Sequence, residues 1–274
     1  MKNYTIKNKV LYILIGTTML SSSCQDVIKV DLPTDQQSTL VVDAFIYSDS
    51  VAKVALALSI PYFEQTDYPK VKADLVTITD NTNTDTLLET PVGSGKYIGK
   101  NIVGAIGKIY TLKILYNNTE YVAIDKLNRN THFDSLYFVD FPYGRPGSPY
   151  KKFSCISHTD PAGLGDNYIA YFFRNDTSFN SINDINFTTD QFIDGNQAKD
   201  VYIGRPVKMG DKVRVEVHSL STQAYNYYFQ IINNAVRQQS LFAPPPAPYK
   251  GNISGNALGF FKASAVSAKE GVVQ

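Results

Sequence analysis

Hydrophobic and polar residues alternate along most of this 274-residue chain with the two-residue period of a β-strand. Residues 212–220 (KVRVEVHSL) show the pattern most clearly, because their valines fall on one face and their charged residues on the other. Residues 39–47 and 51–59 repeat it on either side of a short turn, so we expect them to pair as a hairpin. The same pattern predicts shorter strands at residues 73–79, 86–89, 96–98, 108–116, 120–124, 133–141, 151–158, 168–174 and within 252–263. The chain is therefore predicted to be mostly β.

One segment, residues 222–239, changes to the period of an α-helix. Ala224 and Tyr228 belong to an apolar face at helical spacing, and either Ser221 or Thr222 can serve as the N-cap. We expect this helix to pack against a sheet through its cluster of tyrosines.

The spacing of turn residues indicates how the strands are grouped. Between residues 38 and 128, about seven short strands alternate with turn signals roughly every 8–12 residues, which is typical of an immunoglobulin-like β-sandwich. Residues 129–274 are predicted to form a second β-rich domain that carries the one packed helix. Within it, residues 175–200 are rich in Asn, Asp and Thr and are expected to make a long excursion over the surface.

The N-terminus has the order of features found in a secretory signal peptide. Three lysines precede an apolar run at residues 10–20, and three serines then lead to Cys24. We therefore expect residues 1–23 to be a lipoprotein signal peptide, Cys24 to be the lipidated residue, and the polar residues 24–37 to be a tether. A conventional exported cysteine and an uncleaved anchor are the alternatives, although the apolar run is shorter than the roughly 20 residues that span a bilayer.

Charge and cysteine content narrow the function classes. The whole chain has 26 Lys and Arg against 25 Asp and Glu. This balance lacks the basic footprint of a nucleic-acid-binding protein. With Cys24 lipidated, Cys155 would have no disulfide partner, and its strand-like surroundings predict a buried, unreactive thiol.

Motifs for catalysis are missing from the sequence. No serine stands in a G-x-S-x-G elbow, and no glycine-rich loop has the phosphate-binding pattern. His218 falls on the polar face of its strand, where we expect it to be solvated. Asp160 and Asp166 lie in a loop after His158 and are a weak calcium-loop candidate, since turn formation alone explains that loop. We expect no enzyme activity, no cofactor and no metal.

Ligand contacts, if aromatic, would come from loops. Tyr143, Tyr150 and Tyr249 lie in Gly- and Pro-rich segments and are the candidates for an exposed platform that binds a glycan or a peptide.

Several short segments together carry a family resemblance. The longest is residues 251–261 (GNISGNALGFF), which follows the predicted helix. The others are residues 30–33 (VDLP), 40–44 (LVVDA), 109–112 (IYTL), 160–161 (DP), 167–168 (NY) and 210–211 (GD). With these segments the chain resembles the domain of unknown function 4249 (DUF4249) family over nearly all of its length after Cys24.

The resemblance implies a lipoprotein in the outer membrane of Bacteroidetes-type bacteria, facing the cell exterior and associated with a TonB-dependent transporter. It implies no catalytic residues. We therefore expect a binding or accessory subunit that takes part in nutrient uptake, held in the membrane through Cys24. The alternatives are a free-standing cell-surface glycan or peptide binder and a structural component of envelope assembly.

Overall fold

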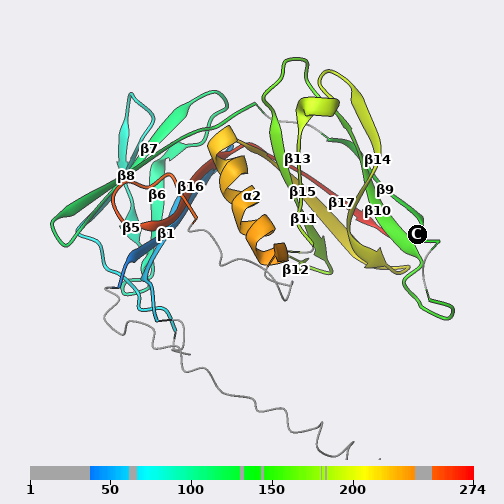
Figure 1. Cartoon of the computed structure of the whole chain (residues 1–274), viewed down its shortest axis with the longest axis horizontal. Coiled ribbons are helices and arrows are strands. Elements are labelled where there is room, and N and C mark those ends of the chain that lie inside the picture. Colours follow the sequence, from blue (N-terminus) through cyan, green and yellow to red (C-terminus); the bar gives the residue numbers. More distant parts are fainter. Residues whose placement is uncertain are drawn as a thin grey trace, which may run out of the picture. The chain divides into compact units, whose positions relative to one another are not determined.

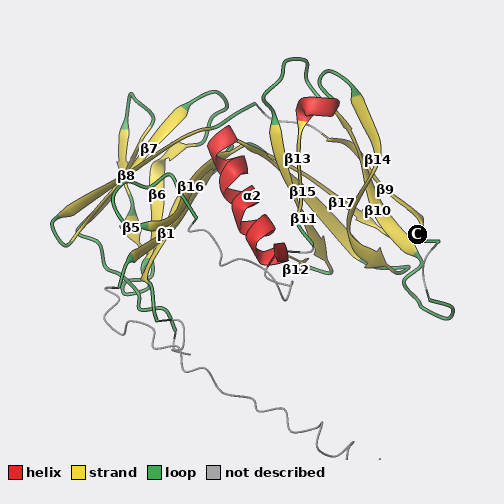
Figure 2. Cartoon of the chain, viewed as in Figure 1, coloured by secondary structure: helices red, strands yellow, loops and turns green. Residues whose placement is uncertain are grey.

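Strands account for most of the described chain, as the alternation predicts (Figures 1 and 2). The computed structural model describes residues 38–61, 67–129, 133–142, 145–179, 181–182, 184–237 and 249–274. The predicted signal peptide, Cys24 and the tether lie outside these ranges. The strands are β1 (Leu40–Tyr47), β2 (Val51–Leu58), β3 (Leu75–Thr79), β4 (Thr84–Thr86), β5 (Leu88–Glu89), β6 (Lys96–Val103), β7 (Ile109–Tyr116), β8 (Thr119–Lys126), β9 (Phe133–Asp140), β10 (Lys152–Thr159), β11 (Asn167–Arg174), β12 (Thr177–Phe179), β13 (Asn186–Thr189), β14 (Gln197–Val207), β15 (Lys212–Leu220), β16 (Leu258–Ser264) and β17 (Val266–Val272). The helical elements are the 3-10 turn η1 (Asp190–Phe192) and the α-helix α2 (Thr222–Arg237).

Two sheets enclose the first hydrophobic core. One has the strand order β16-β1-β2-β6-β5 and the other the order β4-β3-β7-β8. Alternate residues of β1, β2, β3 and β7 meet between them, with Ile46, Leu56, Ile78 and Tyr110 among the most buried. This arrangement is a β-sandwich, and the expected hairpin of β1 and β2 is confirmed. Its immunoglobulin-like character stays a prediction.

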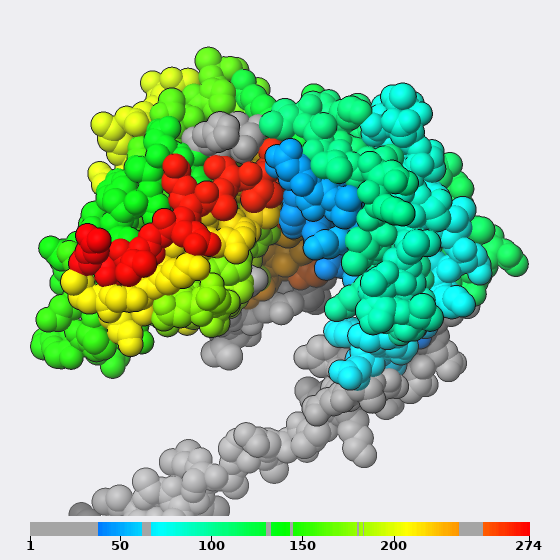
Figure 3. Space-filling view, turned by 180° about the vertical axis from the view of Figure 1, so that it is seen from behind, coloured from blue at the N-terminus to red at the C-terminus, as the bar shows by residue number. Residues whose placement is uncertain are grey.

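A strand from the end of the chain completes this sandwich. β16 pairs in parallel with β1, in a register that joins Val41 to Leu258 and Tyr47 to Ser264. Figure 3 shows the C-terminal residues in red beside the first strand in blue. The division of the chain near residue 128 stays a prediction, but β16 comes from the predicted second domain and belongs to the first sandwich. Residues 38–274 accordingly form one compact unit.

A second pair of sheets encloses another core. They have the strand orders β14-β10-β9 and β12-β11-β15-β17, with β13 also paired to β11. The valines of β15 face this core, as their alternation predicts, together with Phe133, Tyr168 and Phe172.

The expected surface excursion over residues 175–200 is wrong, because strands β12 and β13 and the start of β14 lie there. β12 and β13 both pair with β11, and their side chains stay exposed or half-buried. Polar residues suffice in such edge strands because little of their surface is buried, so the hydrophobic alternation that identifies strands is weak. Strand β17 was also missed: Val266, Ala268 and Val272 alternate in it, but all of its residues are exposed or half-buried, and Lys269, Glu270 and Gly271 interrupt the apolar pattern.

The helix α2 begins where the sequence predicts. The Ser221 hydroxyl accepts a hydrogen bond from the backbone N–H of Ala224 at 3.1 Å, which makes Ser221 the N-cap. Ala224 is fully buried and packs with Ile169, Leu220 and Phe260, so the helix contacts strands of both sandwiches. Among the described residues, no helix combines the length and apolar character needed to cross a membrane.

Candidate ligand-binding pocket

The outer face of β1 and β16 carries aromatic and charged side chains. Even-numbered residues of β1 are buried in the first core, so Asp43, Phe45 and Tyr47 point to the opposite side. The parallel register places Phe260 beside Asp43, and Lys262 beside Phe45. An outer sheet face with this many aromatic residues is normally covered by another element.

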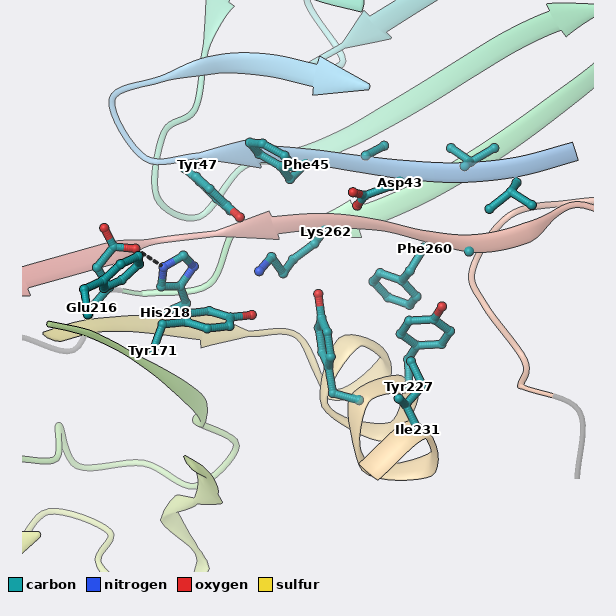
Figure 4. A pocket seen from close by; sticks show the side chains of 16 residues that line it. Asp43, Phe45, Tyr47, Tyr171, Glu216, His218, Tyr227, Ile231, Phe260 and Lys262 are labelled. Atoms are coloured by element: carbon teal, nitrogen blue, oxygen red, sulfur yellow. Dashed lines mark hydrogen bonds and ion pairs between the residues drawn. The ribbon is translucent and has the colours of Figure 1, made fainter. Parts of the chain in front are cut away.

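Strands β11 and β15 and helix α2 face these side chains across a cavity of about 520 Å³. Figure 4 shows Tyr171, Glu216 and His218 approaching from the strands, and Tyr227 and Ile231 from the helix. The volume lies in the range of small-molecule sites, which is roughly 300–1,000 Å³. Seven of the 16 lining residues are aromatic: Phe45, Tyr47, Tyr171, Phe173, Tyr227, Tyr228 and Phe260.

Lys262 is a buried cation in this cavity. The residue is only 5% exposed, and its Nζ atom lies 5.1, 5.4 and 5.5 Å from the ring centres of Tyr47, Tyr171 and Tyr228. Within the described ranges, no carboxylate oxygen lies within 4.0 Å of that nitrogen. Burial lowers the pKa of Lys262 to about 8, against the opposing influence of Asp43 and Asp125.

His218 is buried beside Lys262, so the expectation that it is solvated is wrong. Its ring lies edge-on to Tyr47 and Tyr171, with centroids 5.0 and 4.9 Å apart. Burial, together with the charges of Lys262 and Arg214, lowers the pKa of His218 to about 2. The neutral imidazole therefore donates from Nε2 to Glu216 Oε2 at 3.2 Å. The polar face of β15 misled the prediction because Tyr47, from the other sandwich, covers its end.

The tyrosine hydroxyls are neutral donors. Burial raises the pKa of Tyr171 to about 12, and it raises those of Tyr47 and Tyr228 well above the usual value. The site thus offers one ammonium and several hydroxyl groups inside aromatic walls. This is an arrangement for holding a ligand by charge, hydrogen bonds and ring contacts.

The tyrosines predicted to contact ligand do not gather in one place. Tyr143 lies outside the described residues. Tyr150 lies under the guanidinium of Arg174, 5.1 Å away, and lines a separate open depression. Tyr249 is 40% exposed. The pKa of Tyr227 is raised by burial first, then by Asp43 and then by Tyr249, so Tyr249 lies near the pocket.

The pocket residues were missed because they stand in strands and in the helix rather than in loops. A signal was present in residues 43–47 (DAFIY), where the outward face carries two aromatic side chains. An outward face of that kind indicates burial on both sides of a strand.

The predicted calcium-loop residues separate in the structure. Asp166 forms an ion pair with Arg129, whose guanidinium also donates to the carbonyls of Pro161, Ala162 and Gly163. Asp160 instead joins Asp190 and Asp194, and carboxylate oxygens of these three residues lie within 4.8 Å of one another. Such a group could hold a cation, but several of these oxygens already accept hydrogen bonds from Tyr168 and from backbone N–H groups.

His158 and Cys155 lie in β10 and are both buried. His158 Nε2 lies 3.8 Å from the Asp160 carboxylate, and neither ring nitrogen has a hydrogen-bond partner in the part of the chain that is described. Burial lowers the pKa of His158 and raises that of Cys155 to about 11. The prediction of a buried cysteine is confirmed, and its thiol stays protonated at neutral pH.

The segment 251–261 owes its composition to the path of the chain into β16. The Asn252 side chain accepts from the N–H of Phe261 at 2.9 Å and donates to its carbonyl at 2.8 Å. Ser254 makes two hydrogen bonds with the backbone of Val122 in β8. Gly259 has a φ of +105°, and a Cβ there would lie 1.9 Å from the carbonyl oxygen of Val42. The segment therefore docks β16 against β1 and β8.

Comparison with known proteins bears on the family alone. No curated protein matches the chain. The family model described as Domain of unknown function (DUF4249) matches residues 25–270. The match includes the docking segment at residues 251–261 and every strand that lines the pocket, and the chain belongs to the DUF4249 family.

Proposed function

We propose that the protein is an outer-membrane lipoprotein, anchored through Cys24 and facing the cell exterior. It acts as a non-enzymatic binding or accessory subunit of a TonB-dependent transporter in nutrient uptake. The order of features in residues 1–24 supports the anchor. The cavity around Lys262 is the observation that carries the binding role.

The composition of the cavity favours binding over catalysis. Its described lining includes no Ser, Thr or Cys that could act as a nucleophile. His218, the imidazole in the lining, donates from Nε2 to Glu216, and burial lowers its pKa to about 2, so its remaining nitrogen is too weak a base to take a proton from a substrate near neutral pH.

One observation favours the alternative of a free-standing glycan or peptide binder. Tyr150, Arg174 and Arg205 line the open depression of about 500 Å³, and Arg174 lies over the Tyr150 ring. Guanidinium and tyrosine groups at an open surface suit hydroxylated or acidic polymers. A structural role in envelope assembly has no comparable feature.

The test is affinity purification of the tagged chain from membranes in mild detergent, with the Cys24→Ala variant as the matched control. The proposal expects a TonB-dependent barrel to be recovered in near-equal amount with the wild-type chain. It expects the Cys24→Ala chain to leave the membrane fraction and to lose most of the barrel.

Recovery of the wild-type chain alone from outer membranes would contradict the accessory role. Glycan and peptide binding would then be measured with the Tyr150→Ala variant. Loss of binding in that variant, with unchanged thermal unfolding, would support the alternative.

A further inference from the structure

We propose that the cavity between β1, β16, β15 and α2 binds a small organic monocarboxylate, whose carboxylate contacts Lys262 Nζ. This inference deepens the proposed function, on which it rests, by giving the chemical class of the ligand.

The first argument is the missing counter-charge. An ammonium removed from water is costly unless a charge or strong hydrogen-bond acceptors compensate it. Three tyrosine rings lie 5.1–5.5 Å from Lys262 Nζ, and their faces compensate only part of that cost. A carboxylate entering the cavity would supply the full counter-charge and could also accept hydrogen bonds from the neutral tyrosine hydroxyls.

The second argument is the charge balance of the lining. Lys262 is the cation of the described lining, because His218 is neutral. Glu216 is already paired with Arg214 and His218. The Asp43 carboxylate also lines the cavity and acts on Lys262, but it forms no ion pair with Lys262 among the described residues and is exposed, so water screens its charge. A single negative charge therefore matches the site, whereas a phosphate dianion would leave one charge uncompensated near Asp43.

The third argument is the wall beyond the cation. Tyr227 and Phe260 stack with their centroids 4.8 Å apart, and Ile231 lies beside them in the lining. These surfaces suit the apolar part of a ligand. Figure 4 shows Lys262 pointing into the space between this wall and the Tyr47 and His218 side chains.

The experiment uses the purified full chain and isothermal titration with benzoate and hexanoate as probes. Benzamide is the neutral match for benzoate, and inorganic phosphate tests the charge argument. The variants are Lys262→Met, which keeps the length of the side chain, and Lys100→Met on the exposed face of β6 as the control.

We expect at least one of the two carboxylates to bind at millimolar concentration or tighter, and benzamide to bind about tenfold more weakly than benzoate. Lys262→Met should lower carboxylate affinity about tenfold or more, whereas Lys100→Met should leave it unchanged. Equal binding of benzoate and benzamide, tighter binding of phosphate, or no binding of either carboxylate below about 10 mM would overturn the proposal.

A pH series on the wild-type chain gives a readout that does not depend on the folding of a variant. The titratable groups around Lys262 are Asp43 and Tyr47 from β1, Asp125 from β8, Tyr171 from β11, Glu216 and His218 from β15, and Tyr227 and Tyr228 from α2. The tyrosines and His218 stay uncharged between about pH 7 and pH 9, so loss of the Lys262 proton should weaken carboxylate binding across that range. Affinity that does not change with pH would count against Lys262 as the anchor.

This outcome is separable from that of the membrane purification. Failure of carboxylate binding with a barrel still recovered would reject the ligand class and leave the accessory role standing. Carboxylate binding without recovery of a barrel would reject the accessory role and leave the ligand class standing.

Discussion

Lys262 Nζ lies 5.1 Å from the centre of the Tyr47 ring, a contact between the edge strand β16 and its neighbour β1. The two side chains are on the outer face of that sheet, and His218 packs edge-on against the same tyrosine. A cation and a neutral imidazole therefore share one aromatic enclosure. Burial acts on both groups in the same sense, because it disfavours the charged form of each.

We expect Lys262→Met to stabilise the protein at pH 7. The pKa of Lys262 falls from 10.5 to about 8 on folding, so below pH 8 the folded chain bears the cost of a buried charge. Part of this cost is offset by the ring contacts, and the net gain should be about 1–3 kcal/mol. Urea unfolding of the wild type, Lys262→Met and Lys100→Met measures it.

The same group predicts a pH dependence. Between pH 8 and 10.5 the unfolded lysine keeps a proton that the folded lysine has lost, so wild-type stability should rise with pH from about 8 to 9.5. Lys262→Met should lack this rise. A variant that is less stable than wild type and keeps the same pH profile would show that the ammonium is not destabilising.

His218 should make stability fall in acid. Its folded pKa of about 2 lies below the ordinary value of 6.5, so the unfolded chain takes up a proton as the pH falls below 6.5 and the folded chain does not. His218→Gln should flatten the loss of stability between pH 7 and 4. His158→Gln is the matched control, because the pKa of His158 is lowered by burial to a smaller extent. An imidazole NMR signal from His218 that titrates near pH 6.5 in the folded protein would contradict the prediction.

Asp85 should be a major stabilising residue of the first sandwich. Burial alone would raise its pKa, but hydrogen bonds from three backbone N–H groups and from the Asn101 amide in β6 outweigh burial and lower it. Asp85→Ala leaves these donors without an acceptor and should cost about 2–4 kcal/mol. Asp85→Asn keeps one acceptor oxygen and should cost less, while Asp74→Ala at an exposed position should cost little.

The structure favours the charged form of Asp85, whereas it disfavours the charged form of Lys262. Its stabilisation is present above the unfolded pKa and is lost as the pH falls through the folded pKa. Equal urea midpoints for Asp85→Ala and Asp74→Ala at pH 7 would refute the role of these hydrogen bonds.

Gly259→Ala should separate β16 from β1. The φ of +105° and the approach of 1.9 Å to the Val42 carbonyl leave no room for a methyl group. Gly93 has a φ of +80° with nothing near its Cβ position, so Gly93→Ala should cost only about 1 kcal/mol of backbone strain. Hydrogen exchange of the β1 and β16 amides should increase in Gly259→Ala and stay unchanged in Gly93→Ala; increased exchange in both variants would mean that steric contact at Gly259 is not the cause.

Strong alternation made much of the fold predictable. β1 and β2 bury every second side chain, β15 does so from Lys212 to Val217, and α2 has a capping serine directly before an apolar face, so local pattern and tertiary packing agree there. β12 and β13 could not be recognised because they are three and four residues long and mostly polar, and β17 because Lys269, Glu270 and Gly271 break its apolar pattern. The pocket was out of reach for another reason: Tyr47, Tyr171, Tyr228 and Lys262 are far apart in sequence. Only the parallel pairing of β1 with β16 and the docking of α2 bring them together.

The position of β16 has a consequence for biogenesis. The ribosome delivers residues 40–47 long before residues 258–264, so the edge of β1 that pairs with β16 stays unpaired while the rest of the chain emerges. Open edges of this kind can pair with the wrong strands and promote aggregation, so the chain is exposed to misfolding until β16 is made. A premature stop codon upstream of residue 258 would therefore damage the sandwich nearest the N-terminus, at the opposite end of the gene from the lesion.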